Sequence, residues 1–173
     1  MRHAVYGIVS TSEQASIVVV RLREAGFTRD DISVLLPDKK GTRDFAHEKN
    51  TKAPEGAAAG GVAGMGIGAV LGWLAGVGSL AIPGAGPLIA AGPIMAALSG
   101  AAVGGATGGV VGALVGLGVP EYEAKRYDGK IRGGNALVSV HTESSREQRR
   151  AKKILEKAGA ADISSSTESS VTA

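Results

Sequence analysis

The N-terminal part of the chain changes from the apolar period of a strand to that of a helix and back again. Residues 4–9 (AVYGIV) are a short β-branched run bounded by polar residues, which predicts a strand. The next apolar residues recur at helical spacing: Ala15, Val18, Val19, Leu22 and Ala25. Residues 31–37 (DISVLLP) predict a second strand. The pattern therefore indicates a β-α-β unit.

The C-terminal part repeats this pattern. Residues 136–141 (ALVSVH) predict a strand, and a helical apolar stripe follows it at Ala151, Ile154, Leu155 and Ala158. RLREAGFTRDDIS at 21–33 is echoed by KILEKAGAADIS at 153–164. Because strand, helix and exit recur in the same order, the two parts indicate a duplication. We therefore predict an α+β fold, a ferredoxin-like split β-α-β domain built from two such units.

Residues typical of helix ends bracket both predicted helices. Capping-box pairs precede them: Ser10 with Glu13 or Thr11 with Gln14 in the first unit, and Ser144 with Glu147 in the second. Gly26 and Gly159 suit the left-handed position after a helix. A further helix is predicted over 120–132, with Ala124, Tyr127 and Ile131 on one side.

An uncharged window separates the two units. Residues 56–120 contain no Asp, Glu, Lys, Arg or His, and they hold 20 of the 27 glycines. Many of these glycines recur at every fourth position, in one row of Gly56, Gly60, Gly64, Gly68, Gly72 and Gly76 and a second row of Gly100, Gly104, Gly108, Gly112 and Gly116. Since glycine costs about 1 kcal/mol in a helix interior, such rows indicate a helix face that needs close backbone approach.

The window predicts a glycine-zipper hairpin of two helices, over 56–82 and 94–118. Pro83, Pro87 and Pro93 interrupt the apolar sequence between the arms and mark the hairpin turn. Arms of about 25 residues would span about 37 Å, enough to cross a hydrocarbon core of about 30 Å. The expected division is 1–53 for the first half of the ferredoxin-like domain, 54–119 for the hairpin, 120–165 for the second half and 166–173 for a disordered tail.

Two environments for this hairpin are compatible with the sequence. Lys and Arg flank the window on both sides, and the intervening turn carries no charge, which favours insertion in a membrane with both flanks cytoplasmic. The N-terminus, MRHAVYGIVSTSEQ, lacks the apolar core expected of a secretory signal peptide. The alternative is a soluble cytoplasmic homo-oligomer whose core is built from the hairpins.

Catalytic and cofactor motifs are not recognisable in the sequence. Cysteine is absent, and His3, His47 and His141 lack the spacing of a metal site. The glycine-rich window contains no Lys for a P-loop and no dinucleotide fingerprint after a strand. Charges of both signs are interspersed in the flanks, unlike a nucleic-acid footprint. We expect no enzyme activity, cofactor, metal, nucleic acid or small-molecule substrate.

Three segments together resemble one protein family. They are EAGF with DDISVL, then GWLAGVGSLAIPGAGPLIAAGPIMAAL, then GLGVPEYEAKRYDGKIRGGNALVSVH. The chain resembles the bacterial heat-induced general stress protein family over nearly its whole length. The resemblance implies a stress-associated bacterial protein that is membrane-associated, without known catalytic residues. With the charge pattern, it gives an expected location at the inner membrane.

The glycine rows favour self-assembly as the function. Five or six glycines in each row exceed what one crossing of two helices needs, so neighbouring hairpins are expected to pack side by side. The alternative is that glycine only lets the two arms of one hairpin pack along their full length. The expected partners are therefore further copies of this chain and a lipid membrane.

Overall fold

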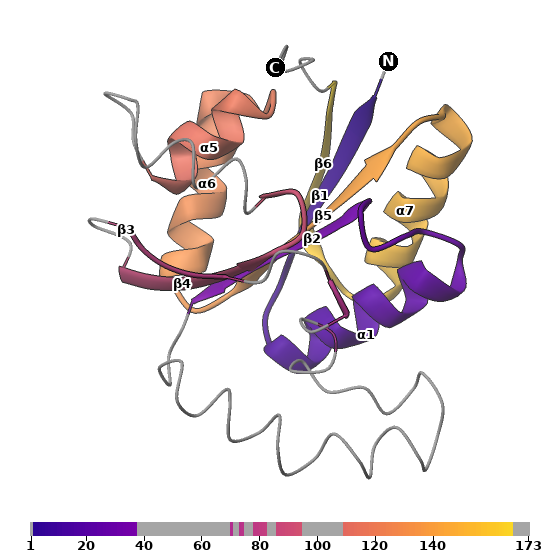
Figure 1. Ribbon diagram of the computed structural model, residues 1–173. Coiled ribbons are helices and arrows are strands. Elements are labelled where there is room, and N and C mark those ends of the chain that lie inside the picture. Colours follow the sequence, from indigo (N-terminus) through magenta and orange to yellow (C-terminus); the bar gives the residue numbers. More distant parts are fainter. Residues whose placement is uncertain are drawn as a thin grey trace, which may run out of the picture.

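The structure is a computed structural model that describes residues 2–37, 70, 73–74, 78–82, 86–94 and 109–167. These residues form an α+β fold with a six-stranded sheet in the order β3-β4-β2-β5-β1-β6 (Figure 1). Each neighbouring pair of strands is antiparallel. The prediction of an α+β fold is confirmed.

The N-terminal unit forms as its sequence predicts. Strand β1 (His3–Val9) leads into helix α1 (Ser12–Glu24), and strand β2 (Ile32–Pro37) follows. Of the two possible capping pairs, the Thr11 pair is the one that forms, because the Thr11 side chain accepts a hydrogen bond from the Gln14 N–H. Gly26 follows the helix with a φ of 97°, in the left-handed region.

The C-terminal unit also matches its predicted elements. Strand β5 (Ala136–Thr142), helix α7 (Ser145–Lys157) and strand β6 (Ala161–Thr167) follow one another, and Ser144 caps α7. Strand β1 lies between β5 and β6, pairing His3 with Thr142 on one side and with Thr167 on the other. Strand β6 thus runs two residues into the segment expected to be a disordered tail, and 168–173 lie outside the described residues.

The apolar window extends the sheet, which its glycine pattern does not predict. Strands β3 (Gly78–Ile82) and β4 (Gly86–Ala91) form an antiparallel pair, and β4 pairs with the free edge of β2. The prediction of one helix over 56–82 is therefore wrong at 78–82. Leu36 opposite Ile89 and Leu35 opposite Ala90 show why: the uncharged residues of β4 provide a partner for a buried strand.

The second predicted arm, over 94–118, is interrupted. Helix α5 (Val110–Gly116) begins after Gly109, whose φ of 89° and ψ of −158° are accessible essentially to glycine alone. A continuous helix through this position is therefore wrong. Helix α6 (Glu121–Arg132) follows, and Ala124, Tyr127 and Ile131 are its buried residues, as predicted.

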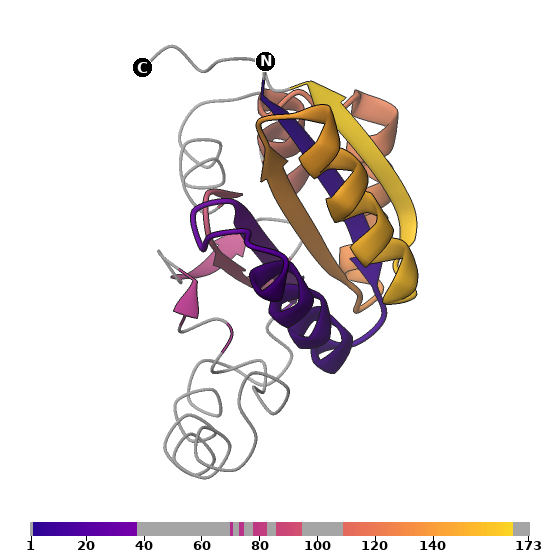
Figure 2. The ribbon, with the colours of Figure 1, turned by 90° about the vertical axis from the view of Figure 1, so that its right-hand side faces the viewer.

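Helices cover both faces of the sheet (Figure 2). Alternation along β1 separates two hydrophobic clusters, with Val5 and Val9 in one and Ala4, Tyr6 and Ile8 in the other. Helices α1 and α7 contribute to the first cluster, whereas α5 and α6 contribute to the second. The domain is therefore a three-layer structure with the sheet in the middle.

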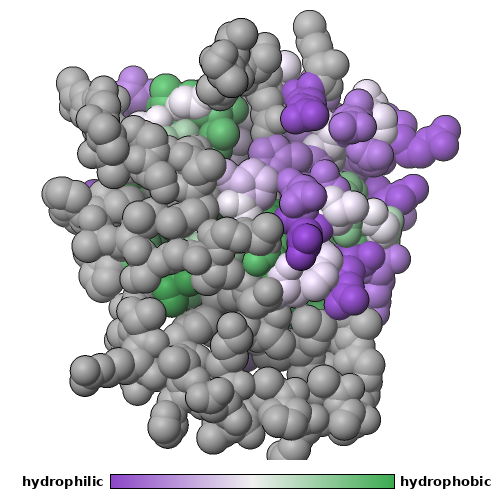
Figure 3. Space-filling model, viewed as in Figure 1, coloured by the Kyte–Doolittle hydropathy of each residue, from purple (hydrophilic) through white to green (hydrophobic). Residues whose placement is uncertain are grey.

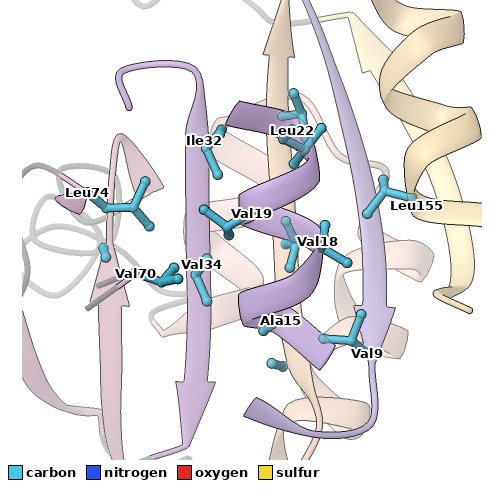
Figure 4. Close-up of a cluster of buried hydrophobic side chains, with 14 of the residues drawn as sticks. Val9, Ala15, Val18, Val19, Leu22, Ile32, Val34, Val70, Leu74 and Leu155 are labelled. Atoms are coloured by element: carbon cyan, nitrogen blue, oxygen red, sulfur yellow. The ribbon is translucent and has the colours of Figure 1, made fainter. Parts of the chain in front are cut away.

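The two predicted arms contribute to opposite faces of this sheet. Val70 and Leu74, from the first arm, are buried in the cluster beneath α1, where Val70 lies beside Val34 (Figure 4). Val110 and Leu114, from the second arm, are buried in the cluster on the other face. In the described residues the arms are therefore not the two sides of one helical hairpin, and that prediction is wrong here.

Candidate functional site

Helix α5 is the part of the apolar window whose placement bears most directly on the glycine rows. It ends in a Schellman motif: the Gly118 N–H donates to the Val115 carbonyl and the Val119 N–H donates to the Leu114 carbonyl, both at 3.0 Å. Gly118 takes a φ of 95° there. Both ends of this short helix are thus fixed by glycines in conformations that other residues rarely adopt.

One side of α5 is part of the core. Val110, Ala113 and Leu114 are buried and belong to the same cluster as Leu88 and Ile94. A fully buried Val or Leu contributes about 1.5–3 kcal/mol, so these residues stabilise the packing of α5 on the sheet. The orientation of α5 is therefore set by its inner face.

The opposite side of α5 is uncharged and open. Val115 is 42% exposed, Gly116 is exposed, and Val111 and Gly112 are partly buried. A Cβ added at Gly116 would meet no heavy atom within 4 Å. Hydrophobic side chains reach the surface where α5 lies in Figure 3. We call the three residues 112, 115 and 116 the outer face of α5, since Val111 packs against the core cluster.

Two members of the predicted glycine rows fall on this outer face. Gly112 and Gly116 are one helical turn apart, so their spacing does place them on one side of a helix, as predicted. The other nine glycines lie outside the described residues: Gly56, Gly60, Gly64, Gly68, Gly72, Gly76, Gly100, Gly104 and Gly108.

The predicted hairpin turn has a different structure from the one expected. Pro87 lies within β4, Pro93 follows that strand, and Pro83 lies outside the described residues. Gly92, with a φ of 86°, makes the turn after β4 possible, because a Cβ there would lie 2.1 Å from the Ile32 carbonyl oxygen. The buried Ser33 hydroxyl then accepts from the Ile94 N–H at 3.1 Å. The two described prolines thus lie in β4 and in the turn that follows it.

A polar contact between α6 and β6 was not predicted from the sequence. The Tyr127 hydroxyl donates to the Asp162 carbonyl at 2.8 Å and is hydrogen-bonded to the Ser164 hydroxyl. Burial is the main cause that raises the pKa of Tyr127 to about 12. Asp162 has a φ of 50° and lies at the β-bulge opposite Gly7. The only sequence signal for this contact is the run of small hydroxyl residues in β6.

The described residues contain neither a metal-binding cluster nor a helix that could span a membrane. Over those residues, no three His, Asp or Glu side chains are grouped so that they could hold a metal ion. The helices described there are all too short or too polar to cross a bilayer. Comparisons with family models, with curated proteins and with solved structures found no match to this chain.

Proposed function

We propose that the fold is a ferredoxin-like domain whose two β-α-β units are separated by an insertion that joins the same sheet. The support is the order β6-β1-β5-β2, in which the strands of the two units interleave, with α1 and α7 on one face. The insertion adds β4 and β3 beyond β2 and covers the opposite face with α5. In this proposal the apolar window is part of the domain.

We further propose that the protein is a non-enzymatic, stress-associated protein that assembles with itself through the outer face of α5. The observation that carries this proposal is the open space at Gly116 beside the exposed Val115 on an uncharged helix. Glycine lets a neighbouring backbone come close, and valine supplies apolar area to bury. The stress association rests on the family resemblance alone.

The size of α5 limits what this face does alone. A helix of seven residues is about 10 Å long, whereas a stable protein interface buries about 1,200–2,000 Å². We therefore propose that the α5 contact is one part of a larger interface between copies of the chain. The burial of Val70, Leu74 and α5 against the sheet supports packing of this segment on protein and favours the homo-oligomer over a lipid-inserted hairpin.

Replacing Gly116 by leucine tests the proposed contact, and the chain offers a matched control. Gly129 on α6 is also an exposed helical glycine whose added Cβ would meet nothing within 4 Å. Both substitutions raise helix propensity by about 1 kcal/mol and should leave the fold intact. We expect Gly116→Leu to lower the particle mass in analytical ultracentrifugation, because the side chain holds two helices apart, and Gly129→Leu to keep it. Equal masses for the two variants would contradict the proposal.

A further inference from the structure

Helix α7 carries six cations that have no carboxylate partner among the described residues. Its residues Arg146, Arg149, Arg150, Lys152, Lys153 and Lys157 are all exposed. Over the described ranges, none of these six has a carboxylate oxygen within ion-pair distance. Of the two acidic residues of α7, Glu147 accepts from the Glu143 N–H at 2.8 Å as part of the cap. With Glu156 exposed as well, α7 carries six cations against two carboxylates and so has a net positive charge.

Helix α6 on the other side of the sheet shows the contrast. Each of its four cations has a carboxylate within 4.0 Å: Lys125 pairs with Glu121, Arg132 pairs with Asp128, and Arg126 and Lys130 both face Asp162. The hydrogen bond from Lys125 and its charge lower the pKa of Glu121. The lysine and arginine side chains of α6 are thus paired with carboxylates, whereas those of α7 have no such partner among the described residues.

Three cations of α7 lie on the side of the helix that faces away from the sheet. Arg146, Arg149 and Lys153 lie on the side of α7 opposite its buried Ala151 and Leu155. Helix α1 lies alongside α7 (Figure 2), tied to it at both ends: Arg150 Nη1 donates to the Ala25 carbonyl at 3.0 Å, and Gln14 Nε2 donates to the Ala158 carbonyl at 2.6 Å. Hydrophilic side chains gather on this side of the molecule in Figure 3.

The layer of α1 and α7 also contains an exposed apolar side chain. Ile17 on α1 is 49% exposed and lies one turn from the exposed Arg21. Neither α1 nor α7 contains an aromatic residue on which a nucleic-acid base could stack. Because α1 flanks α7, this helix also does not protrude as a helix that enters a groove must. On α1, Ile17 has the exposed Glu13 one turn before it and Arg21 one turn after it, so the positive charge comes from α7. An excess of exposed cations on one helix beside an exposed apolar side chain on the next fits the interface of an anionic bilayer.

We propose that the face formed by α7 and the adjacent part of α1 docks on an anionic lipid surface. The binding is peripheral and electrostatic, with Ile17 at the level of the headgroups. The apolar side of α7 takes no part, since Ala151 and Leu155 are buried in the core. This site lies on the face of the sheet opposite α5 and is independent of the contact proposed there.

Vesicle sedimentation of the full chain tests this site. We expect the protein to bind vesicles of phosphatidylcholine mixed with phosphatidylglycerol and not to bind vesicles of pure phosphatidylcholine. The bound protein should dissociate in about 1 M salt, where the Debye length is about 3 Å. Replacing Arg146, Arg149 and Lys153 together by glutamine should weaken binding roughly 100-fold. The matched control replaces Lys125, Lys130 and Arg132 on α6 by glutamine, and it should bind the anionic vesicles as tightly as the unaltered chain does.

Three results would overturn the proposal. They are equal vesicle binding by the two triple variants, binding that survives about 1 M salt, and binding to duplex DNA with no binding to anionic vesicles. Circular dichroism confirms that each variant is folded, and this is expected because every replaced side chain is exposed. Failure of this site would leave the α5 contact untouched, since the ultracentrifugation of Gly116→Leu needs no lipid.

Discussion

At the scale of single residues, the contact of Tyr127 with β6 attaches helix α6 to the edge strand of the sheet. Tyr127 is 1% exposed, and its ring centroid lies 6.1 Å from that of Tyr6 on β1. Its hydroxyl donates a hydrogen bond to the carbonyl of Asp162, the residue of the β6 bulge that has a positive φ. Tyr127 thus supplies the buried contact between α6 and the edge strand, beside the ion pairs that Arg126 and Lys130 make with the Asp162 carboxylate. The polar end of Tyr127 is shared with the Ser164 hydroxyl.

Tyr127→Phe should lower the free energy of unfolding by about 1–2 kcal/mol at neutral pH, because the hydrogen bond to Asp162 is lost. The folded-state pKa of Tyr127 is raised to about 12, above its ordinary value of 10.0. Its contribution is therefore fully present below pH 10 and is lost as the pH rises toward 12. Denaturant titrations should show a constant advantage of the unaltered chain from pH 8 to pH 10, and above pH 10 this advantage should shrink by up to about 1.4 kcal/mol per pH unit. A difference that stays constant above pH 10 would contradict the assignment.

Gly92→Ala should be much more costly than an alanine at another left-handed glycine. Its Cβ would lie 2.1 Å from the Ile32 carbonyl oxygen, so the backbone of β2 or of the turn must move. Gly26, with a φ of 97° and nothing within 4 Å of an added Cβ, is the matched control for conformational strain alone. We expect a loss of at least about 3 kcal/mol for Gly92→Ala and about 1–2 kcal/mol for Gly26→Ala in urea unfolding. Similar losses would show that the turn relaxes freely.

At the scale of elements, the sequence predicts structure well where its signals are local. Thr11 and Ser144 each accept a hydrogen bond from the residue three positions on, and Gly26 and Gly159 follow their helices with positive φ. In the apolar window these signals fail. GSLAI and GPLIAA have no charged residue and no polar-apolar alternation to define a face, so a buried strand and a buried helix look alike in sequence. Gly109 lies within the second predicted arm and precedes the start of α5, yet nothing in the sequence distinguishes it from the other glycines of the window.

The candidate site shows the same limit at the scale of elements. The spacing of Gly112 and Gly116 correctly places them together on one side of a helix. It does not show that this helix packs on the sheet through Leu114, because that depends on β4 extending the sheet and providing Leu88 and Ala90 on the facing side. Contacts distant in sequence therefore decide which side of α5 is open.

Ser144→Ala tests the local signals directly. The Ser144 hydroxyl accepts from the Glu147 N–H at 3.2 Å, and the Glu147 carboxylate accepts from the Glu143 N–H. Removing the hydroxyl should cost about 1 kcal/mol of unfolding free energy, whereas Ser145→Ala, one position into the helix, should cost much less. Thermal unfolding of both variants measures this difference, and equal effects would show that the cap is not significant.

At the scale of the whole molecule, the two predicted units and the window share a common core. Val70 and Leu74 contribute to one hydrophobic cluster, and Leu88, Ile94 and Leu114 contribute to the other. The sheet is thus covered on the face of α6 by a helix from the window as well. Removal of the window should therefore affect the stability of the whole domain.

Replacing residues 54–118 by a short linker should therefore destabilise the domain. The deletion removes β4 from the edge of β2 and uncovers Leu35 and Leu137, which are fully buried. We expect a lower urea midpoint, weaker near-ultraviolet circular dichroism and binding of a hydrophobic dye. If the shortened chain were as stable as the full chain, the window would be an appendage to the domain, which is what the sequence-based hairpin prediction implies.

The most direct test of self-assembly uses the absence of cysteine from the chain. A single cysteine in place of Val115 lies on the outer face of α5, and one in place of Gly129 lies on an exposed part of α6. A disulfide forms only where two Cα atoms come within about 7 Å. If α5 meets α5 of another copy, Val115→Cys should form a covalent dimer rapidly on mild oxidation of dilute protein, and Gly129→Cys should not. Equal cross-linking of the two variants, or none in particles of unchanged mass, would contradict assembly through this face.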